Sequence, residues 1–388
     1  MLGLLLARAG VNVIVLEKHA DFFRDFRGDT IHPSTLEVMY ELGFLDDLLK
    51  LPHHKAPQLT GWLGDQRATI ADFSHLPVHC GYIAFMPQWD FLTFLSERGK
   101  QWPGFDLRMH AEAVGLIEAD ERIVGLRGNS PTGPFEIRAA LTIACDGRHS
   151  TLAPAAGLYP REQGAPMDVM WFKLGKRDDD TIETFGRFDA GRIFVLIHRG
   201  DHYQCGYVIA KDQMSALKAR GLEALRADIA HLSTLGAQRV NAEIKSFDDF
   251  SLLTVAVNRL DRWWKPGFLA IGDAAHAMSP VGGIGINLAL QDAIAAANIL
   301  AKPLREGRAS DADLAAVQAR RMWPTKVTQW IQVVIQNHVI RPALASGGTL
   351  KPPLIFRLLA RFPLLRRLPA RAIGMGVRPE HVRTMAAE

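Results

Sequence analysis

A glycine-rich stretch at residues 272–287 constrains the fold more than any other part of this 388-residue chain. It follows a short apolar run, residues 268–271, and precedes an apolar segment with helical periodicity, residues 285–300. This order predicts a buried strand, a tight turn and a long helix. Glycines in such a turn let the backbone approach a ligand closely, and the free N–H groups at the start of the helix favour a polar or negative group. The pattern Gly-Asp, then Pro-x-Gly-Gly-x-Gly-x-Asn, is too specific for a turn that serves packing alone.

Asp273 stands directly after the expected strand, where its carboxylate can accept hydrogen bonds from a polyol such as a ribityl chain. With the glycines that follow, it resembles a motif of the FAD-dependent aromatic-ring hydroxylases, flavoprotein monooxygenases of the p-hydroxybenzoate hydroxylase type. The resemblance extends over essentially the whole chain and implies that Asp273 holds the ribityl hydroxyls of FAD. It also implies that the flavin ring is lined by Pro280, Gly283, Gly285, Ile286 and Asn287. The N–H groups at the start of the helix would then stabilise the negative charge of reduced flavin.

The N-terminal residues predict a second contact with the cofactor. Residues 2–9 are expected to form a helix that ends at Gly10, and residues 11–16 a buried strand of the parallel type that ends at Glu17. An acid at this place in a nucleotide-binding sheet accepts the hydroxyls of a ribose, whereas an isolated acid at a strand end is usually solvated. The extended fingerprint of the family is matched in its tail only, by Gly3, Leu6 and Gly10. The resemblance therefore implies a Rossmann-like FAD-binding sheet whose first strand and GxGxxG turn are absent from the 388 residues.

Three more residues are assigned to the cofactor by the resemblance. Arg27 lies in a segment that places an arginine near the FAD phosphates, and Gln88 begins an expected helix, residues 88–98, at the ribityl side. Asp146 follows an expected core strand and belongs to an Asp-Gly segment with which the hydroxylases handle both FAD and NAD(P)H. The residues alone leave open a solvated arginine, a helix cap and a structural turn. The family pattern also has an arginine three residues after the serine of this segment, where this chain has Ala153.

The pattern of elements predicts an α/β fold in two parts with a helical C-terminus. Alternating short strands suggest that the chain twice leaves its first domain for an inserted mixed β-sheet substrate domain. The discontinuous FAD-binding domain is expected at residues 1–57, 86–165 and 259–345. The substrate domain is expected at residues 58–85 and 166–258, and a C-terminal helical segment at residues 346–388.

Aromatic residues and histidines of the expected substrate domain are candidates for contact with a substrate, although most side chains in such strands belong to a core. They are Trp171, Phe172, His198, Tyr203 and Tyr207. His32 and His276 could reach the edge of the flavin, but such histidines more often serve only as hydrogen-bond partners. No residue is assigned as a catalytic base.

The charge balance and the cysteines exclude several classes of function. Basic residues number 45 and acidic residues 41, with no long basic run, so nucleic acid is not an expected partner. The three cysteines lie far apart, which predicts neither a metal site nor a disulfide framework and favours the cytoplasm. No apolar stretch reaches the ~18 residues of a membrane helix, so no integral membrane segment is expected. The oligomeric state is left open, with a homodimer as one alternative.

The segment at residues 355–367 is both basic and amphipathic, which leaves two interpretations. It attaches to a membrane surface, or it forms a terminal pair of helices that pack on the body. Pro363 interrupts the segment, and packing is the favoured interpretation.

Together these patterns predict an FAD-dependent monooxygenase that uses NAD(P)H and O2 to hydroxylate an aromatic or similar apolar small molecule. Two alternatives remain at this level. One is a flavin oxidoreductase that does not hydroxylate, and the other is a truncated, non-catalytic homologue with defective FAD binding.

Overall fold

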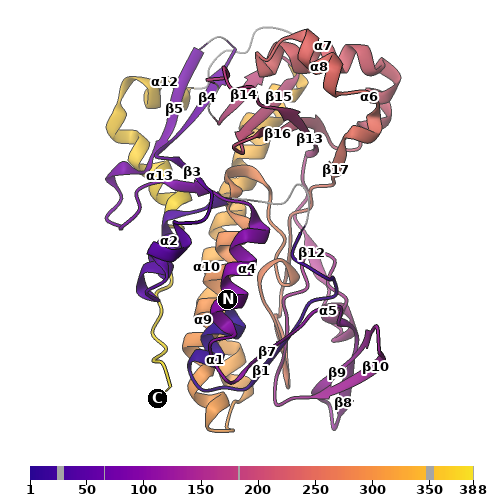
Figure 1. The fold of residues 1–388 in the computed structure, drawn as a ribbon, viewed down its shortest axis with the longest axis vertical. Coiled ribbons are helices and arrows are strands. Elements are labelled where there is room, and N and C mark those ends of the chain that lie inside the picture. The colour runs from indigo at the N-terminus through magenta and orange to yellow at the C-terminus, as the bar shows by residue number, and fades with distance from the viewer. Residues whose placement is uncertain (24–29, 65, 182–183, 347–353, 388) are drawn as a thin grey trace.

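Two long helices, α9 (Gly285–Arg305) and α10 (Asp311–Ile335), form the axis of the molecule and run side by side in Figure 1. The structure is a computed structural model that describes residues 1–23, 30–64, 66–181, 184–346 and 354–387. Other helices pack around α9, which explains why apolar residues occupy most of its circumference. By length and composition, α9 with the turn before it could cross a membrane, but 67% of that apolar window is buried inside the protein.

The first helix lies where the sequence predicts it. Helix α1 (Leu2–Arg8) is followed by Gly10, whose φ of 83° turns the chain. Its leucines are buried between α9 and α4 (Gln88–Gly99). Helix α2 (Pro33–Glu41) begins at a proline, which has the φ of a first helical turn, and α3 (Leu45–Leu48) follows it.

Two parallel pairs of strands lie in two separate small sheets. Strand β1 (Val13–Leu16) pairs with β7 (Phe105–Arg108), and β11 (Thr142–Ala144) pairs with β20 (Phe268–Ala270). Strand β20 also carries the antiparallel β19 (Trp264–Lys265) and is fully buried in a cluster with residues of α9, as the sequence predicts.

The prediction that β1 is a buried strand is wrong. Its residues are half-buried at most, and Ile14 is 40% exposed. Among the described residues β1 pairs with β7 alone. Parallel strands are usually apolar because other elements bury both of their faces. The apolar sequence of β1 is therefore not sufficient evidence that both of its faces are buried.

A seven-stranded mixed sheet forms the upper part of the molecule in Figure 1. Its order is β17-β13-β16-β15-β14-β4-β5, and every neighbouring pair is antiparallel except β14 and β4. The strands are β4 (Gln58–Leu63), β5 (Gln66–Asp72), β13 (Met167–Gly175), β14 (Phe185–Asp189), β15 (Arg192–His198), β16 (His202–Ala210) and β17 (Ser251–Leu253). Two distant stretches of the chain therefore share one sheet.

Smaller sheets complete the body. They are formed by β2 (Thr30–Ile31), β6 (Ile83–Phe85) and β3 (His54–Ala56); by β8 (Glu112–Ala119), β9 (Arg122–Ser130) and β10 (Gly133–Arg138); and by β12 (Pro160–Glu162) with β18 (Asn258–Leu260). Strand β6 ends the first expected excursion but lies outside the seven-stranded sheet. The division into domains itself stays a prediction.

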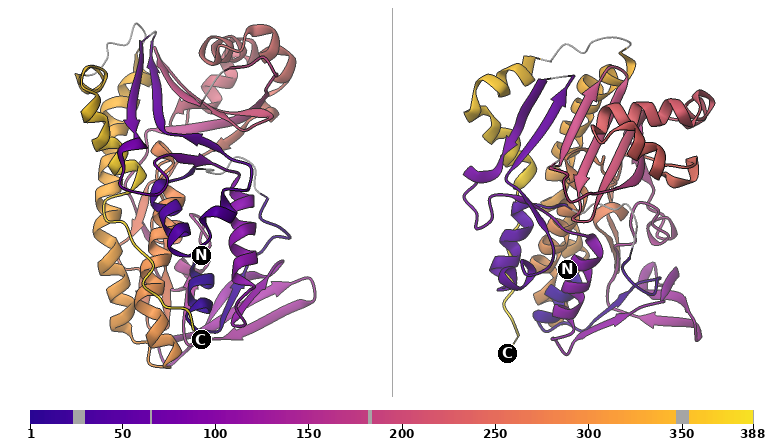
Figure 2. Two further views of the ribbon diagram at one scale, coloured as in Figure 1. Left: turned by 60° about the vertical axis from the view of Figure 1, so that its left-hand side comes forward. Right: turned by 45° about the horizontal axis from the view of Figure 1, so that its top comes forward.

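The two faces of the seven-stranded sheet are covered differently. One face carries α6 (Met214–Arg220), α7 (Leu222–Ser233) and α8 (Ala237–Glu243), as Figures 1 and 2 show. Helices α6 and α7 are separate because Gly221 between them has a φ of 86°, which interrupts the helix. The other face packs on the π-helical turn η5 (Gln336–Ile340) and on α11 (Arg341–Ala345).

The C-terminal segment packs on the body, as the favoured interpretation predicts. Helices α12 (Leu354–Arg361) and α13 (Arg367–Gly374) lie against the edge strand β5 (Figure 2). The last residues run back in extended form to α1, where the N–H of Ala387 donates to the carbonyl of Arg8 at 2.7 Å.

Candidate functional site

The loop between β20 and α9 is the centre of the candidate site. It opens with the short turn η3 (Gly272–Ala274), and α9 begins at Gly285. No described side chain caps α9, and its first turn contains no acid, so the N–H groups at its start are left for another partner. A Cβ atom added to Gly285 would lie 4.0 Å from Oδ1 of Asp273. The carboxylate and the start of the helix are therefore neighbours.

The backbone conformation and the close packing at Gly283 leave no room for a side chain. Its φ is 63°, and an added Cβ would collide with Oγ1 of Thr30 on strand β2. That hydroxyl donates to the carbonyl of Gly283 at 3.0 Å. The carbonyl of Gly283 is thus held by the protein, and the loop packs closely against β2 at this point.

Asn287 joins the start of α9 to the segment after β2. Its Oδ1 accepts from the N–H of His32 at 3.0 Å and from Oγ1 of Thr35 at 2.9 Å. Its Nδ2 donates to the carbonyls of Thr30 at 3.0 Å and Gly283 at 3.2 Å. The amide of Asn287 is therefore fully used inside the protein, and only its backbone remains for a cofactor.

Three glutamines on one face of α10 and η5 hold the loop from the opposite side. Gln332 accepts from the N–H of Ser279 at 3.2 Å and donates to the carbonyls of Ser279 at 3.0 Å and Val281 at 3.1 Å. Gln336 donates to the Ser279 hydroxyl at 2.7 Å, and Gln329 donates to the carbonyl of Ala277 at 3.2 Å. The loop is thus fixed by side-chain amides rather than by regular secondary structure.

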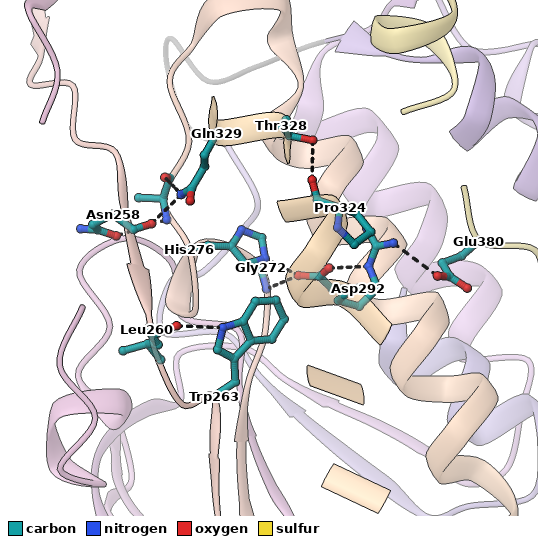
Figure 3. Close-up of polar contacts among 12 residues, drawn as sticks. Asn258, Leu260, Trp263, Gly272, His276, Asp292, Pro324, Thr328, Gln329 and Glu380 are labelled. Atoms are coloured by element: carbon teal, nitrogen blue, oxygen red, sulfur yellow. Dashed lines mark hydrogen bonds and ion pairs between the residues drawn. The ribbon is translucent and has the colours of Figure 1, made fainter. Parts of the chain in front are cut away.

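A buried charge network lies behind the loop (Figure 3). Asp292 of α9 bonds to Nε2 of His276 at 2.5 Å, to the N–H of Gly272 at 3.1 Å and to Nε of Arg321 at 2.9 Å. Arg321 of α10 also contacts Glu380 at 3.3 Å. None of these four side chains is more than 4% exposed. The network therefore ties the turn at Gly272 to α9, α10 and the C-terminal tail.

Asp292 is ionised within this network. Burial by itself would raise the pKa of Asp292, but the charges of His276 and Arg321 and their hydrogen bonds outweigh it and hold the pKa below its usual value. A buried carboxylate is tolerated only where such partners satisfy it.

Two acids that were expected to bind the cofactor, Asp146 and Asp273, lie at the ends of neighbouring strands. Asp146 and Asp273 follow the carboxyl ends of β11 and β20, which are parallel neighbours, so both lie at one edge of the sheet. Oδ2 of Asp146 accepts from the N–H groups of Thr151 at 2.8 Å and Leu152 at 3.2 Å, at the start of α5 (Leu152–Ala155). This bonding is that of a helix cap and supports a structural part for Asp146.

The remaining expected contacts lie at other helix and strand ends. Glu17 is half-buried just after β1, and its Oε1 accepts from the N–H of His19 at 2.9 Å. Gln88 is the first residue of α4, directly after Pro87. Arg27 lies outside the described residues.

Among the aromatic candidates, only Trp171 lies on the sheet face that packs toward the loop. Trp171 packs in the cluster that contains Val281, whereas Phe172, Tyr203 and Tyr207 belong to the core beneath α7. The Tyr207 hydroxyl donates to the buried carboxylate of Asp228 at 3.1 Å. Burial, together with the charge of Asp228, raises the pKa of Tyr207 to about 12.

His198 follows the same alternation as the core residues of β15. Its ring lies 4.1 Å from that of His54, so it is a structural partner at the end of the strand.

Sequence reasoning missed the residues that support the loop. Asp292 and Arg321 are separated by 29 positions, and the glutamines lie more than 50 positions from the loop that they hold. One signal was present, since Asp292 is an acid inside an otherwise apolar helix and such an acid is almost never buried without a partner.

Comparison with known proteins assigns the family. The chain matches the model of the FAD binding domain family over residues 1–331. It belongs to this family. A 6-methylpretetramide 4-monooxygenase of Streptomyces rimosus is 30% identical over 386 residues, which cover 99% of this chain and 91% of that enzyme.

Solved structures share the fold. An anhydrotetracycline hydroxylase from Streptomyces rimosus has a TM-score of 0.73 at 23% identity, covering 97% of this chain and 74% of the other. A p-nitrophenol 4-monooxygenase from Pseudomonas putida has a TM-score of 0.72 at 20% identity, covering 94% of each. The predicted Rossmann-like fold, FAD cofactor and monooxygenase class are confirmed, with NAD(P)H as the usual reductant of the family. The non-hydroxylating alternative is not favoured.

The charge network predicts a large effect of one substitution. Asp292→Asn leaves Arg321, which is 1% exposed, with Glu380 as its described acidic partner, a carboxylate that Arg320 also binds. The free energy of unfolding should fall by about 3–5 kcal/mol, measured by urea denaturation at neutral pH. Asp106→Asn removes an ion pair whose side chains are 46% and 48% exposed, and it should leave the denaturation midpoint nearly unchanged. Similar losses in both variants would contradict the account.

His32 adds a pH-sensitive group next to the loop. It is fully buried, its Nδ1 donates to the carbonyl of Ile373 at 2.8 Å, and Nε2 has no partner among the described residues. Burial lowers the pKa of His32 to about 4, although the Ile373 carbonyl acts in the opposite direction. The folded protein therefore holds His32 neutral.

Acid should unfold the protein through this histidine. The unfolded chain takes up the proton near pH 6.5, whereas the folded chain resists it down to about pH 4. Stability should therefore be unaffected above pH 6.5 and fall by about 1.4 kcal/mol per pH unit below it, about 3 kcal/mol in all. Urea titrations between pH 7 and 4 should show a flatter dependence for His32→Asn but not for His110→Asn on the surface. If the free energy of unfolding fell equally steeply with pH in wild type and in His32→Asn, the role of His32 would be refuted.

Proposed function

We propose that this chain is an FAD- and NAD(P)H-dependent monooxygenase that hydroxylates a polycyclic aromatic polyketide. The uncapped start of α9 beside Asp273 is the observation that carries the proposal, because it offers N–H groups and a carboxylate where a flavin needs them. The substrate class is supported by the relative of 30% identity named for 6-methylpretetramide.

In this proposal the residues of the loop bind the cofactor in two ways. Asp273 accepts hydrogen bonds from the ribityl hydroxyls. Backbone groups line the flavin ring at Pro280, Gly283, Gly285, Ile286 and Asn287. When bound, FAD accepts a hydride from NAD(P)H and activates O2. The N–H groups at the start of α9 hold the negative charge of the reduced ring without having to reorient.

The outer parts of the cofactor are assigned to residues at the ends of other elements. Glu17 accepts from the adenosine ribose, Arg27 contacts the phosphates and Gln88 the ribityl side. Asp146 shapes the edge at which NAD(P)H approaches, while its Oδ2 caps α5.

The substrate is proposed to lie between the loop and Trp171, at the margin of the sheet face that η5 and α11 cover. This face is apolar, and its cluster includes Phe188 and the loop residue Val281. Nε1 of Trp171 is buried without an acceptor among the described residues, and an unpaired buried donor favours a substrate oxygen as its proposed partner. Phenols and ketones of a polyketide supply such oxygens.

The discontinuous FAD-binding and substrate domains, with the boundaries given above, belong to the proposal, as do a cytoplasmic location and a homodimer. Two tryptophans seven residues apart on α10, Trp323 and Trp330, are 55% and 65% exposed, and they support a face at which two copies meet.

The two sheet-edge acids should differ in their effect on the cofactor. Asp273→Ala should weaken FAD binding by about 10- to 100-fold, because it removes charge-assisted hydrogen bonds. Asp146→Ala should instead lower the free energy of unfolding by about 1 kcal/mol through loss of the α5 cap, with a smaller change in FAD affinity. Fluorescence titration with FAD measures the first effect and urea denaturation the second. Equal loss of flavin in both variants would contradict this assignment.

The hydroxylation itself can be tested with FAD, NADH or NADPH, O2 and 6-methylpretetramide or a similar tetracyclic phenol. The expected product is heavier by one oxygen atom, which mass spectrometry with labelled O2 identifies. Trp171→Ala should raise KM by about tenfold or more, because it removes stacking area and a hydrogen-bond donor.

Phe172→Leu is the matched control on the opposite face of β13. It should cost about 1 kcal/mol of stability and leave KM unchanged. Flavin-dependent oxidation of NAD(P)H without any oxygen transfer to phenols would overturn the proposed reaction.

A further inference from the structure

The exposed residues of the α12–α13 segment have an unusual composition. Four arginines are exposed there: Arg357, Arg361, Arg367 and Arg371. Between them lie three exposed large apolar residues, Phe362 at 52%, Leu364 at 69% and Leu368 at 68%. We call these seven residues the basic apolar face.

The surrounding sequence contains no negative charge to balance this face. From residue 351 to residue 379 there are seven basic residues and no aspartate or glutamate. Within the described residues, no ion pair is formed by the four arginines. The nearest acid on strand β5, Asp72, is already engaged by Ser74 and Gln58. The basic apolar face is therefore strongly positive.

The face is presented by a segment that is firmly attached on its inner side. Ala370 is fully buried in a cluster with Phe73, and Leu359 is 6% exposed. Arg366 donates to the carbonyls of Leu359 at 2.8 Å and Ala360 at 3.1 Å, which joins the end of α12 to the turn after it. While the segment keeps this attachment, the exposed leucines and phenylalanine cannot become buried in the hydrophobic core.

We propose that the basic apolar face docks the protein on the surface of an anionic lipid bilayer. Phenylalanine and leucine side chains gain free energy by entering the boundary between headgroups and acyl chains. Arginines beside them bind lipid phosphates while their aliphatic stems stay apolar. Both helices have eight residues, far fewer than the ~20 that a membrane-spanning helix needs, so the segment lies on the bilayer and does not cross it.

Other occupants fit the face less well. A second copy of the chain in a two-fold arrangement would bring eight exposed arginines together without acids to balance them. A nucleic acid would match the arginines but leave three large apolar side chains in water. Docking on lipid satisfies both kinds of side chain and places the edge strand β5 toward the bilayer.

Flotation of the full chain with lipid vesicles tests the proposal. Vesicles of phosphatidylcholine alone should retain little protein, and vesicles with about one third phosphatidylglycerol should retain most of it. Raising the salt from about 0.1 M to about 1 M should release the protein in part. The triple variant Arg361→Gln, Arg367→Gln, Arg371→Gln should bind about a hundredfold more weakly, at about fivefold per arginine.

A second variant tests the apolar contribution separately. Phe362→Ser, Leu364→Ser, Leu368→Ser should also lose binding, because insertion and charge act together. The control variant Arg138→Gln, Tyr159→Ser removes one exposed arginine and one aromatic residue that is 72% exposed elsewhere on the surface, and it should bind as wild type. Thermal midpoints of all three variants should match that of the wild type, since every altered side chain is exposed.

Vesicle binding that survives both triple variants would overturn the proposal. So would a wild type that ignores vesicles and elutes as a dimer which the serine variant converts to monomer, because the face would then be an interface between copies.

Discussion

The ionised carboxylate of Asp292, buried inside an apolar helix, is the constraint on which the candidate site depends. Such a charge persists only while His276, Arg321 and the N–H of Gly272 satisfy it. Each partner belongs to a different part of the chain, so keeping the carboxylate satisfied also keeps those parts in register. The turn that carries Asp273 begins at Gly272 and is therefore positioned by the buried carboxylate of Asp292.

Polar contacts from three directions then leave the loop with one set of free groups. The Thr30 hydroxyl donates to the carbonyl of Gly283, and the side-chain amide of Asn287 is hydrogen-bonded within the protein. Gln332 forms hydrogen bonds with both the N–H and the carbonyl of Ser279. The groups that remain are the N–H groups at the start of α9, which are held in place before any ligand arrives. Preorganised donors of this kind stabilise developing negative charge better than water does, because they need no reorientation.

Local signals made much of the fold predictable. Proline at the start of α2 and the apolar run before Gly272 mark their elements without help from the rest of the chain. Alternation along β13 separated Trp171 from Phe172 but could not tell which face α7 would cover, because that depends on packing between distant segments. Asn287 was expected at the flavin, and its partners on β2 and α2 lie about 250 positions away, beyond any local pattern.

Val281 connects the polar and apolar halves of the site. Its carbonyl is held by Gln332, and its side chain packs in the cluster that includes Trp171. The same residue therefore sets where the cofactor loop lies and where the apolar face of the sheet meets it. Because close-packed interiors transmit displacement instead of absorbing it, a shift of α10 would move both surfaces together. The distance between the loop and Trp171 is thus set in part by the contact of Gln332 with the Val281 carbonyl.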